Sequence, residues 1–254
     1  MTSSASPLDA GRRTTATSAD EVEQRLSTDI CSGRLEPGAK LAFGMLRERY
    51  GVGISPLREA LQRLVSQNLV IAESHIGFRV APLSLDELQD VHGLRKQLCS
   101  DALRNSIANG SIAWEAQVLA ASHALGRMPI PNDPYGEDAD RWEESHRQLH
   151  WSLISACRSK WLLQFCRMLD AQYIRYRRIV LARNWHSKNF SERIHREHTA
   201  LIDATINRHA DLAVKLLVAH FDGNAQDLLR LMQEQLSPGP ARTPKKAGRL
   251  ATAK

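Results

Sequence analysis

The stretch Gly51-Val-Gly-Ile-Ser-Pro-Leu-Arg-Glu-Ala-Leu-Gln-Arg-Leu64 has the pattern of an amphipathic helix. We expect Ser55 to be its N-cap and Pro56 its first helical residue, where a missing N–H costs nothing. The polar face carries Arg58 and Gln62 one turn apart. Such a helix is either purely structural or lays its polar face in a groove of DNA. Apolar residues at helical spacing predict the buried face: Leu57, Ala60, Leu61, Leu64 and Val65.

The neighbouring segments favour DNA binding. Residues 41–50 predict a short helix, and residues 69–72 and 77–81 predict the two strands of a hairpin. Helix, turn, helix and a two-stranded wing make up a winged helix-turn-helix domain, which we place at residues 19–82. A first helix is expected upstream, with one stripe of apolar residues: Val22, Leu26 and Ile30.

Residues 20–82 resemble the N-terminal domain of the GntR family of bacterial transcription regulators. The resemblance is carried by four ordered pieces: Ile30-Cys-Ser-Gly-Arg-Leu-Glu-Pro-Gly-Ala-Lys-Leu41, Gly51-Val52, Pro56-Leu-Arg-Glu-Ala-Leu-Gln-Arg-Leu64 and Gly77-Phe-Arg-Val80. It implies that Arg58 contacts DNA and that Gly77 of the wing approaches the minor groove. Family members usually carry arginines where this chain has Gly44 and Ile54, so their operator preference does not carry over. The expected DNA-contacting residues are Arg47, Arg49, Ser55, Pro56, Arg58, Gln62, Arg63, His75 and Gly77.

Residues 84–236 have an almost continuous helical pattern. The expected helices span 85–108, 112–126, 138–156, 159–182, 189–208 and 210–235. This part resembles the all-helical FCD domain found in the FadR branch of the same family, through Leu94-Arg-Lys-Gln-Leu98, Leu149-His150, Ile154-Ser-Ala-Cys-Arg-Ser159, Glu197-His-Thr-Ala-Leu-Ile-Asp-Ala204 and Leu217-Val-Ala-His220. We therefore expect a mainly α protein in which residues 83–236 form an all-helical effector-binding bundle. Residues 1–18 and the basic tail 237–254 are predicted to be disordered.

Four histidines in the helical part point to a metal site. His146 and His150 share a helix face, and His198 and His220 lie on apolar stripes of two later helices. The resemblance implies a divalent metal held by an aspartate, a histidine four residues later and two further histidines. His150, His198 and His220 match these histidines, whereas His146 stands where the aspartate usually is. Four neutral nitrogens favour Zn or Ni over Mn or Mg. Replacement of the acid also fits a weakened or lost metal site.

Arg95 is expected near the middle of an apolar helix stripe, where a buried guanidinium needs an anion. That anion is either an internal carboxylate or the carboxylate of an effector. In FCD domains the matching arginine lies in the effector pocket, and the acid commonly found four residues later is Cys99 here. This favours the effector, and Tyr173 and Tyr176 are expected to line the same pocket. Surface positions are expected for Arg175, Arg177, Arg178, Glu143, Glu144 and His195.

Composition limits the remaining possibilities. Five of the six net positive charges lie in the tail, so the case for DNA rests on pattern and placement more than on bulk charge. No apolar run approaches the ~20 residues that span a bilayer, the N-terminal segment has no signal-peptide core, and the four cysteines form no CxxC pair. We expect a cytoplasmic protein with free thiols and no membrane association.

Together these features predict a homodimeric transcription regulator that is not an enzyme. It is expected to bind a double-stranded DNA operator and to respond to a small carboxylate effector, with a divalent transition metal as cofactor. Two alternatives remain open at this point. The four histidines would also suit a metal-dependent enzyme that activates water, or a sensor for which the metal itself is the signal.

Overall fold

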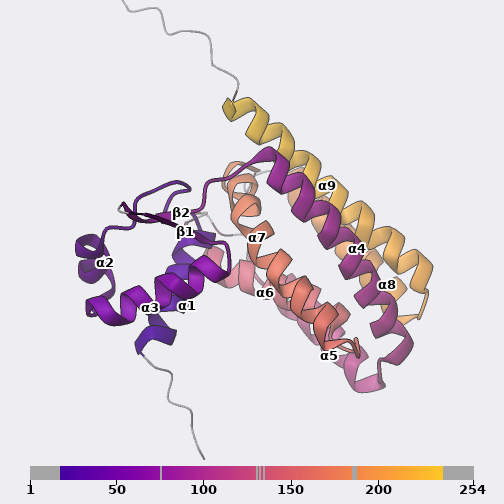
Figure 1. Ribbon diagram of the computed structural model, residues 1–254. Coiled ribbons are helices and arrows are strands. Elements are labelled where there is room, and N and C mark those ends of the chain that lie inside the picture. The colour runs from indigo at the N-terminus through magenta and orange to yellow at the C-terminus, as the bar shows by residue number, and fades with distance from the viewer. Residues whose placement is uncertain are drawn as a thin grey trace, which may run out of the picture.

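The computed structural model of the protein describes residues 18–236, except residues 75, 130, 132, 134 and 185–187. His75 and the two terminal segments therefore lie outside the described residues. A small N-terminal unit lies beside a larger helical unit (Figure 1). The elements in chain order are α1 (Ser18–Cys31), α2 (Phe43–Tyr50), α3 (Ile54–Ser66), β1 (Val70–Glu73), β2 (Gly77–Val80), α4 (Leu85–Asn109), α5 (Ile112–Gly126), α6 (Glu137–Ile154), α7 (Lys160–Asn184), α8 (Lys188–Ile206) and α9 (Ala210–Leu236).

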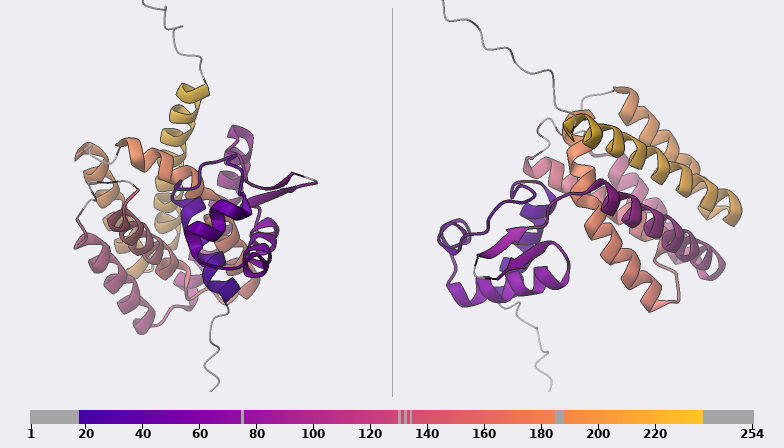
Figure 2. Two further views of the ribbon diagram at one scale, coloured as in Figure 1. Left: turned by 90° about the vertical axis from the view of Figure 1, so that its left-hand side faces the viewer. Right: turned by 45° about the horizontal axis from the view of Figure 1, so that its top comes forward.

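The N-terminal unit is a winged helix-turn-helix, as predicted. Helices α1, α2 and α3 enclose an apolar core, and β1 pairs antiparallel with β2 in the register Val70↔Val80. The hairpin projects from the unit as the wing (Figure 2, left view). The core residues Leu26, Leu46, Leu57 and Leu61 are fully buried, and together they fix the three helices around one centre.

The start of α3 differs from the expectation. The helix begins at Ile54 and its N-cap is Gly53, with extended backbone and no side-chain cap hydrogen bond. The prediction that Ser55 is the cap was wrong, and Pro56 is the third helical residue instead of the first. Proline is tolerated there because the N–H groups of the first turn have no partner within the helix. The predicted end of α2 is confirmed, since Gly51 has a φ of +69° and donates to the Arg47 carbonyl.

The helical unit consists of α4 to α9, and every helix begins and ends within two residues of its predicted position. The long α4 packs along α7 and α9, while α5 packs against α6 and α8, and α8 packs against α9 (Figure 1). Apolar residues from all six helices form the core. Among the residues that the structure describes, no helix is both long and apolar enough to cross a membrane.

Two sets of contacts hold the units together. Arg175 of α7 donates to the carbonyls of Ala81 (2.7 Å) and Pro82 (3.0 Å) in the linker, and Gln172 donates to the Gln67 carbonyl. Arg34 of the N-terminal unit pairs with Asp140 of α6 at 2.7 Å. Asp140 also pairs with Arg178 of α7 at 2.9 Å. The predicted surface position was therefore wrong for Arg175 and Arg178, which are each only 4% exposed.

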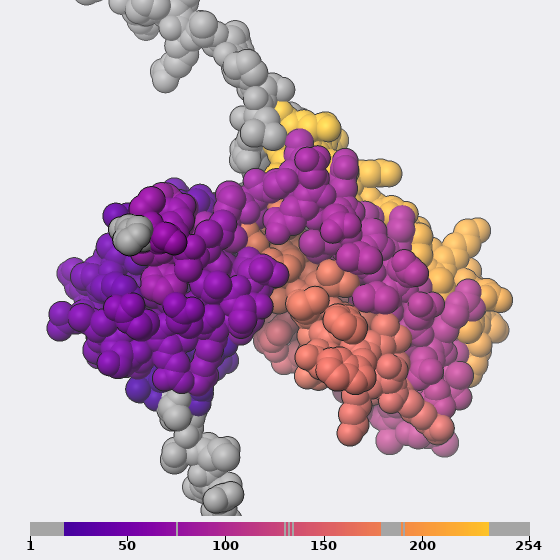
Figure 3. Space-filling model, in the orientation of Figure 1, coloured from indigo at the N-terminus to yellow at the C-terminus, as the bar shows by residue number. Residues whose placement is uncertain are grey.

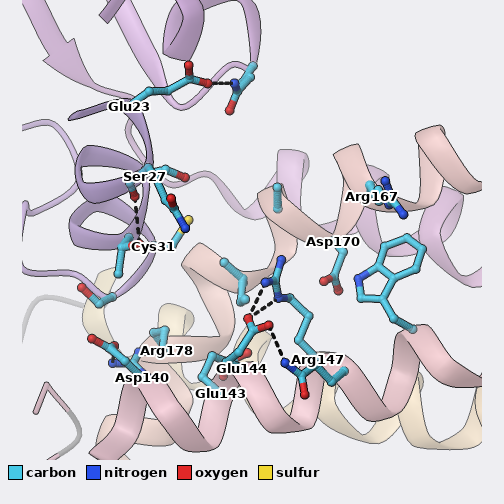
Figure 4. A pocket seen from close by; sticks show the side chains of 18 of the residues that line it. Glu23, Ser27, Cys31, Asp140, Glu143, Glu144, Arg147, Arg167, Asp170 and Arg178 are labelled. Atoms are coloured by element: carbon cyan, nitrogen blue, oxygen red, sulfur yellow. Dashed lines mark hydrogen bonds and ion pairs between the residues drawn. The ribbon is translucent and has the colours of Figure 1, made fainter. Parts of the chain in front are cut away.

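Beside these contacts a cavity of about 1040 Å³ is lined by residues of α1, α6 and α7. Figure 4 shows Glu23, Ser27 and Cys31 of α1 on one wall, facing Glu143 and other polar residues of α6 and α7 on the other. The units thus touch along one side of the interface and are separated on the other. This geometry leaves room for one unit to move against the other.

Asp29 of α1 connects three side chains of the N-terminal unit by hydrogen bonds. Its carboxylate accepts hydrogen bonds from Tyr50 (2.6 Å), Arg34 (2.7 Å) and Arg49 (2.8 Å). Partial burial alone would raise the pKa of Asp29, but these hydrogen bonds lower it below its ordinary value. A folded-state pKa below the unfolded value means that the stabilisation is present above the unfolded pKa. It is lost as the pH falls through the folded pKa.

Asp29→Ala is expected to lower the free energy of unfolding by about 2 kcal/mol, because the Tyr50 hydroxyl loses its acceptor and Arg34 and Arg49 lose their anion. Thermal or urea denaturation measures the change. Asp211→Ala is the matched control, because Asp211 is 93% exposed in its pair with Arg104 and such pairs contribute little. Equal stability of the two variants would contradict the role given to Asp29.

Candidate metal centre and DNA-binding surface

The polar face of α3 is open to solvent. Ser55, Arg58 and Gln62 are exposed along it, and Arg47 is exposed on α2. Neither Arg47 nor Arg58 has an ion-pair partner among the described residues. The guanidinium of Arg58 lies 5.2 Å from the ring centroid of Phe43. This contact keeps the Arg58 side chain next to α2, while the side chain remains exposed to solvent. We propose that these exposed residues form the DNA-facing surface of the unit.

Two other arginines predicted to contact DNA are paired with carboxylates of α1. Arg49 pairs with Asp29, and Arg63 pairs with Asp20 (2.5 Å) and Glu23 (3.1 Å). Their positive charge is therefore largely compensated inside the unit. Pro56 is half-buried on α3. Gly77 has a φ of +110°, so the wing needs glycine there for its backbone conformation.

The four predicted histidines come together in the core of the helical unit. His146 and His150 of α6, His198 of α8 and His220 of α9 each place one ring nitrogen within 4.8 Å of the others. Three are buried, with exposed fractions of 3% (His146), 6% (His198) and 2% (His220). A tetrahedral zinc with bonds of ~2.0–2.1 Å spaces its nitrogens by about 3.3 Å. Small side-chain rotations would therefore close the cluster around an ion.

The chemistry of the cluster fits a transition metal. Burial lowers the pKa of all four histidines, which stay neutral as metal ligands must be. Nδ1 of His220 lies 2.7 Å from a carboxylate oxygen of Glu197, the kind of outer contact that orients a ligating histidine. Nε2 of His198 is buried with no hydrogen-bond partner among the described residues. An unpartnered buried nitrogen in such a cluster is suited to an ion.

Two residues expected at the surface pack against this cluster instead, Glu143 buried and Arg177 half-buried. Arg177 of α7 lies 2.6 Å from Nδ1 of His146 and forms an ion pair with Glu143. Burial, Arg95 and Arg178 lower the pKa of Arg177, although arginine remains protonated in proteins. Helical spacing carried a signal for Arg177, which lies one turn after the buried Tyr173.

Arg95 is buried as predicted, and its internal partner is Asp170 of α7 at 3.1 Å. Helical spacing could not point to this carboxylate, because Asp170 lies on another helix. The guanidinium also lies over the rings of Phe221 (3.8 Å) and Tyr173 (4.6 Å). Arg95 and His150 line one small cavity of about 20 Å³, which is room for about one water molecule.

Tyr176 is not among the residues that line this cavity. Its hydroxyl donates to Glu87 and accepts from the backbone N–H of Ser84, at the start of α4. Tyr173 is the tyrosine that packs against Arg95, and its hydroxyl has no hydrogen-bond partner among the described residues. The two tyrosines are three residues apart, so sequence spacing alone did not separate their roles.

A larger cavity of about 370 Å³ reaches the cluster between α5, α6 and α8. It ends at His198 and is walled by apolar side chains that include Trp142, Leu149 and Ile194. Ser191 and Thr199 add polar groups. Cavities of this size and character commonly bind small molecules.

A winged helix-turn-helix joined to an all-helical unit is an architecture of DNA-binding transcription regulators. The family model for "Bacterial regulatory proteins, gntR family" matches residues 18–80, and the FCD domain model matches residues 90–223. The chain belongs to the GntR family and carries an FCD domain, so it is a DNA-binding transcription regulator.

Similar proteins agree with this assignment. The chain is 39% identical over 203 residues to BphR of Paraburkholderia xenovorans, an uncharacterized HTH-type transcriptional regulator, covering 79% of this chain and 81% of BphR. It is 35% identical over 195 residues to the HTH-type transcriptional repressor GlaR of Escherichia coli, covering 77% of this chain and 88% of GlaR. The fold is also that of E. coli McbR/YncC, with a TM-score of 0.68 at 21% identity, over 86% of this chain and 100% of that one. Because the families and relatives are regulators, the expectation that the chain is not an enzyme is confirmed.

Proposed function

We propose that operator binding by this regulator is controlled by a small organic acid that binds at the histidine cluster with the help of a divalent transition metal. The observation that carries the proposal is the convergence of His150, His198 and His220 on one buried point. The metal would be held by these histidines and would supply a Lewis-acidic centre for a carboxylate oxygen. Neutral nitrogen ligands favour Zn or Ni.

The cavities around the cluster support an acid as the effector. The cavity of about 370 Å³ that ends at His198 has room for a small molecule with an apolar body. On the other side of the cluster, Nε of Arg95 is buried without a partner among the described residues. We therefore propose that Arg95 binds the carboxylate of the effector, which would replace part of its ion pair with Asp170. A carboxylate suits this exchange because it replaces one anion by another.

The control would be transmitted by the helices that line the cluster. α6 carries His146 and His150 near its middle and Asp140, the partner of Arg34, in its first turn. α7 carries Arg177 beside the cluster and Arg175 on the linker carbonyls. A shift of either helix on ligand binding would move the DNA-binding unit, which is the kind of linkage that couples two sites.

The test begins with an operator selected from random double-stranded DNA by the purified full chain. Operator affinity is then measured with and without zinc, and with and without a panel of carboxylic acids. We expect an acid to change operator affinity by about 5- to 150-fold, the usual range of allosteric coupling, and only in the zinc-loaded protein. Affinity that follows zinc alone would indicate a metal sensor instead. Affinity that follows neither would refute control at this centre.

We also propose a homodimer, with two copies of α3 in successive half-sites of the operator. An exposed apolar stripe on α7 supports pairing of two chains: Trp161 is 68% exposed, Phe165 45% and Met168 46%. The rings of Trp161 and Phe165 lie 6.3 Å apart. Figure 3 shows α7 open on the front of the helical unit beside α4. Exposed apolar patches of this kind usually mark interfaces.

Phe165→Glu is expected to convert the dimer to a monomer, because it places a charge in the middle of the apolar stripe. Size-exclusion chromatography with light scattering gives the mass directly. The matched control is Leu119→Glu, which changes a leucine that is 48% exposed on α5, outside the stripe. A Phe165→Glu protein that still has the dimer mass would show that the two chains pair through another surface.

A further inference from the structure

The hydrogen bonding of His146 is not that of a metal ligand. Its Nδ1 lies 2.6 Å from Nη1 of Arg177. A guanidinium has donors and no acceptor, so Nδ1 of His146 accepts and the proton of the neutral ring is on Nε2. The Nε2 atom lies 3.3 Å from Nε2 of His150, toward the inside of the cluster. A ring nitrogen that carries a proton has no lone pair to give to an ion.

The surroundings hold His146 in this state. Glu143, one turn earlier on α6, forms an ion pair with Arg177 and fixes the guanidinium beside the ring. Trp142 stacks on the ring with a centroid distance of 5.1 Å and an interplanar angle of 16°. Glu143 and Arg177 are both nearly buried, with side-chain exposures of 9% and 12%. The tautomer of His146 is therefore set by a buried ion pair, and a reversal of the ring would have to break it.

Each of the other three histidines can offer a lone pair from Nε2. His220 donates from Nδ1 to Glu197 (2.7 Å), so its Nε2 carries no proton and accepts from the Asn224 amide at 3.2 Å, a hydrogen bond that an ion would replace. Nε2 of His150 is the acceptor for His146. Nε2 of His198 has no partner among the described residues. The cluster thus combines three possible nitrogen ligands with one N–H donor.

We propose that His150, His198 and His220 hold the ion, and that His146 is a hydrogen-bond donor to the oxygen anion bound in the ion's remaining position. This rests on the proposed metal and carboxylate function of the same centre. Three histidine ligands leave a zinc ion open to an exogenous ligand. An N–H group pointing at that position favours an anionic oxygen, such as a carboxylate, over a neutral ligand. Arg177 is a positioning residue, because it determines which nitrogen of His146 carries the proton.

The test separates zinc binding from anion binding. Zinc affinity is measured in the full chain by competition with a chromophoric chelator, and acetate binding is followed by the visible absorption of the cobalt-substituted protein. His146→Phe keeps the ring shape and removes both nitrogens. We expect it to keep the zinc stoichiometry and to bind zinc within a few-fold of the wild type. Its acetate affinity is expected to fall by about ten- to a hundredfold, the usual effect of losing a hydrogen bond to a charged group.

Two further variants test the role of the N–H group. His146→Gln retains an N–H donor and is expected to recover much of the acetate response. Arg177→Met releases Nδ1, so that the ring can reverse its tautomer and join the ion. We expect tighter zinc binding and a weaker acetate response from this variant. His209→Ala, at an exposed histidine between α8 and α9, controls for histidine content, and circular dichroism checks the fold of each variant.

Loss of zinc in His146→Phe as severe as that in His150→Ala would overturn the proposal and make His146 a fourth ligand, while leaving the metal site intact. An unchanged acetate response in His146→Phe would overturn it as well. Absence of zinc from the wild type, even with excess zinc, would overturn both the metal site and the role of His146.

Discussion

His198→Ala is expected to lower zinc affinity by more than about a hundredfold, the upper range seen when only an outer contact of a metal ligand is removed. His198 contributes an unpartnered buried nitrogen from α8, whereas His150 and His220 come from α6 and α9. Substitution of His198 therefore removes the nitrogen ligand that α8 supplies to the proposed site. Elemental mass spectrometry after dialysis gives the stoichiometry, and chelator competition gives the affinity.

The control for this prediction is His195→Ala, one turn before His198 on the exposed side of α8. It removes an imidazole from the same helix without touching the cluster. Zinc bound equally well by His198→Ala and the wild type would show that the ion sits elsewhere. Loss of zinc in both variants would mean that α8 as a whole has been disturbed.

Arg58→Ala is expected to weaken binding to the selected operator by about ten- to a hundredfold, the effect of losing a specific contact to a base or phosphate. Arg58 is exposed near the N-terminal end of α3, the end that lies nearest the bases in this class of domain. Its charge is free of ion pairs among the described residues, unlike that of Arg63. Fluorescence anisotropy at a fixed salt concentration measures the change.

The comparison variant is Arg141→Ala, which removes an exposed arginine of α6 that pairs only with the exposed Asp138 among the described residues. It changes the net charge by the same amount outside the DNA-facing surface. We expect its operator affinity to stay close to that of the wild type. Equal losses in the two variants would show that Arg58 acts through bulk charge alone.

Local periodicity predicted most of the fold, because each helix buries an apolar stripe that can be read from spacing alone. The start of α3 was misplaced because Gly53 adopts the extended backbone of an N-cap without using a side chain. Ser55 has the favoured side chain but lies inside the first turn. The preference for serine as an N-cap was therefore overridden by the extended backbone conformation of Gly53.

Residues of the candidate site could be predicted where the evidence for them lies within one helix. The spacing of His146 and His150 places both on one face of α6. His198 and His220 were predicted from the apolar stripes of their helices and from the resemblance to FCD domains. The buried state of Arg177 was missed because its partners lie on α6, more than thirty residues away in sequence. A charged run on a long helix looks solvated until the helix packed against it is known.

The contacts between the two units have a consequence for chimeric regulators. Arg175 binds main-chain carbonyls of the linker and Gln172 binds that of Gln67 at the end of α3, and any sequence with the same backbone offers these. The pair between Arg34 and Asp140 depends on both side chains. A DNA-binding unit grafted from another family member would therefore dock on α7 without redesign. The grafted unit would be coupled to α6 only if it carried an arginine at the position of Arg34, because the pair with Asp140 needs that side chain.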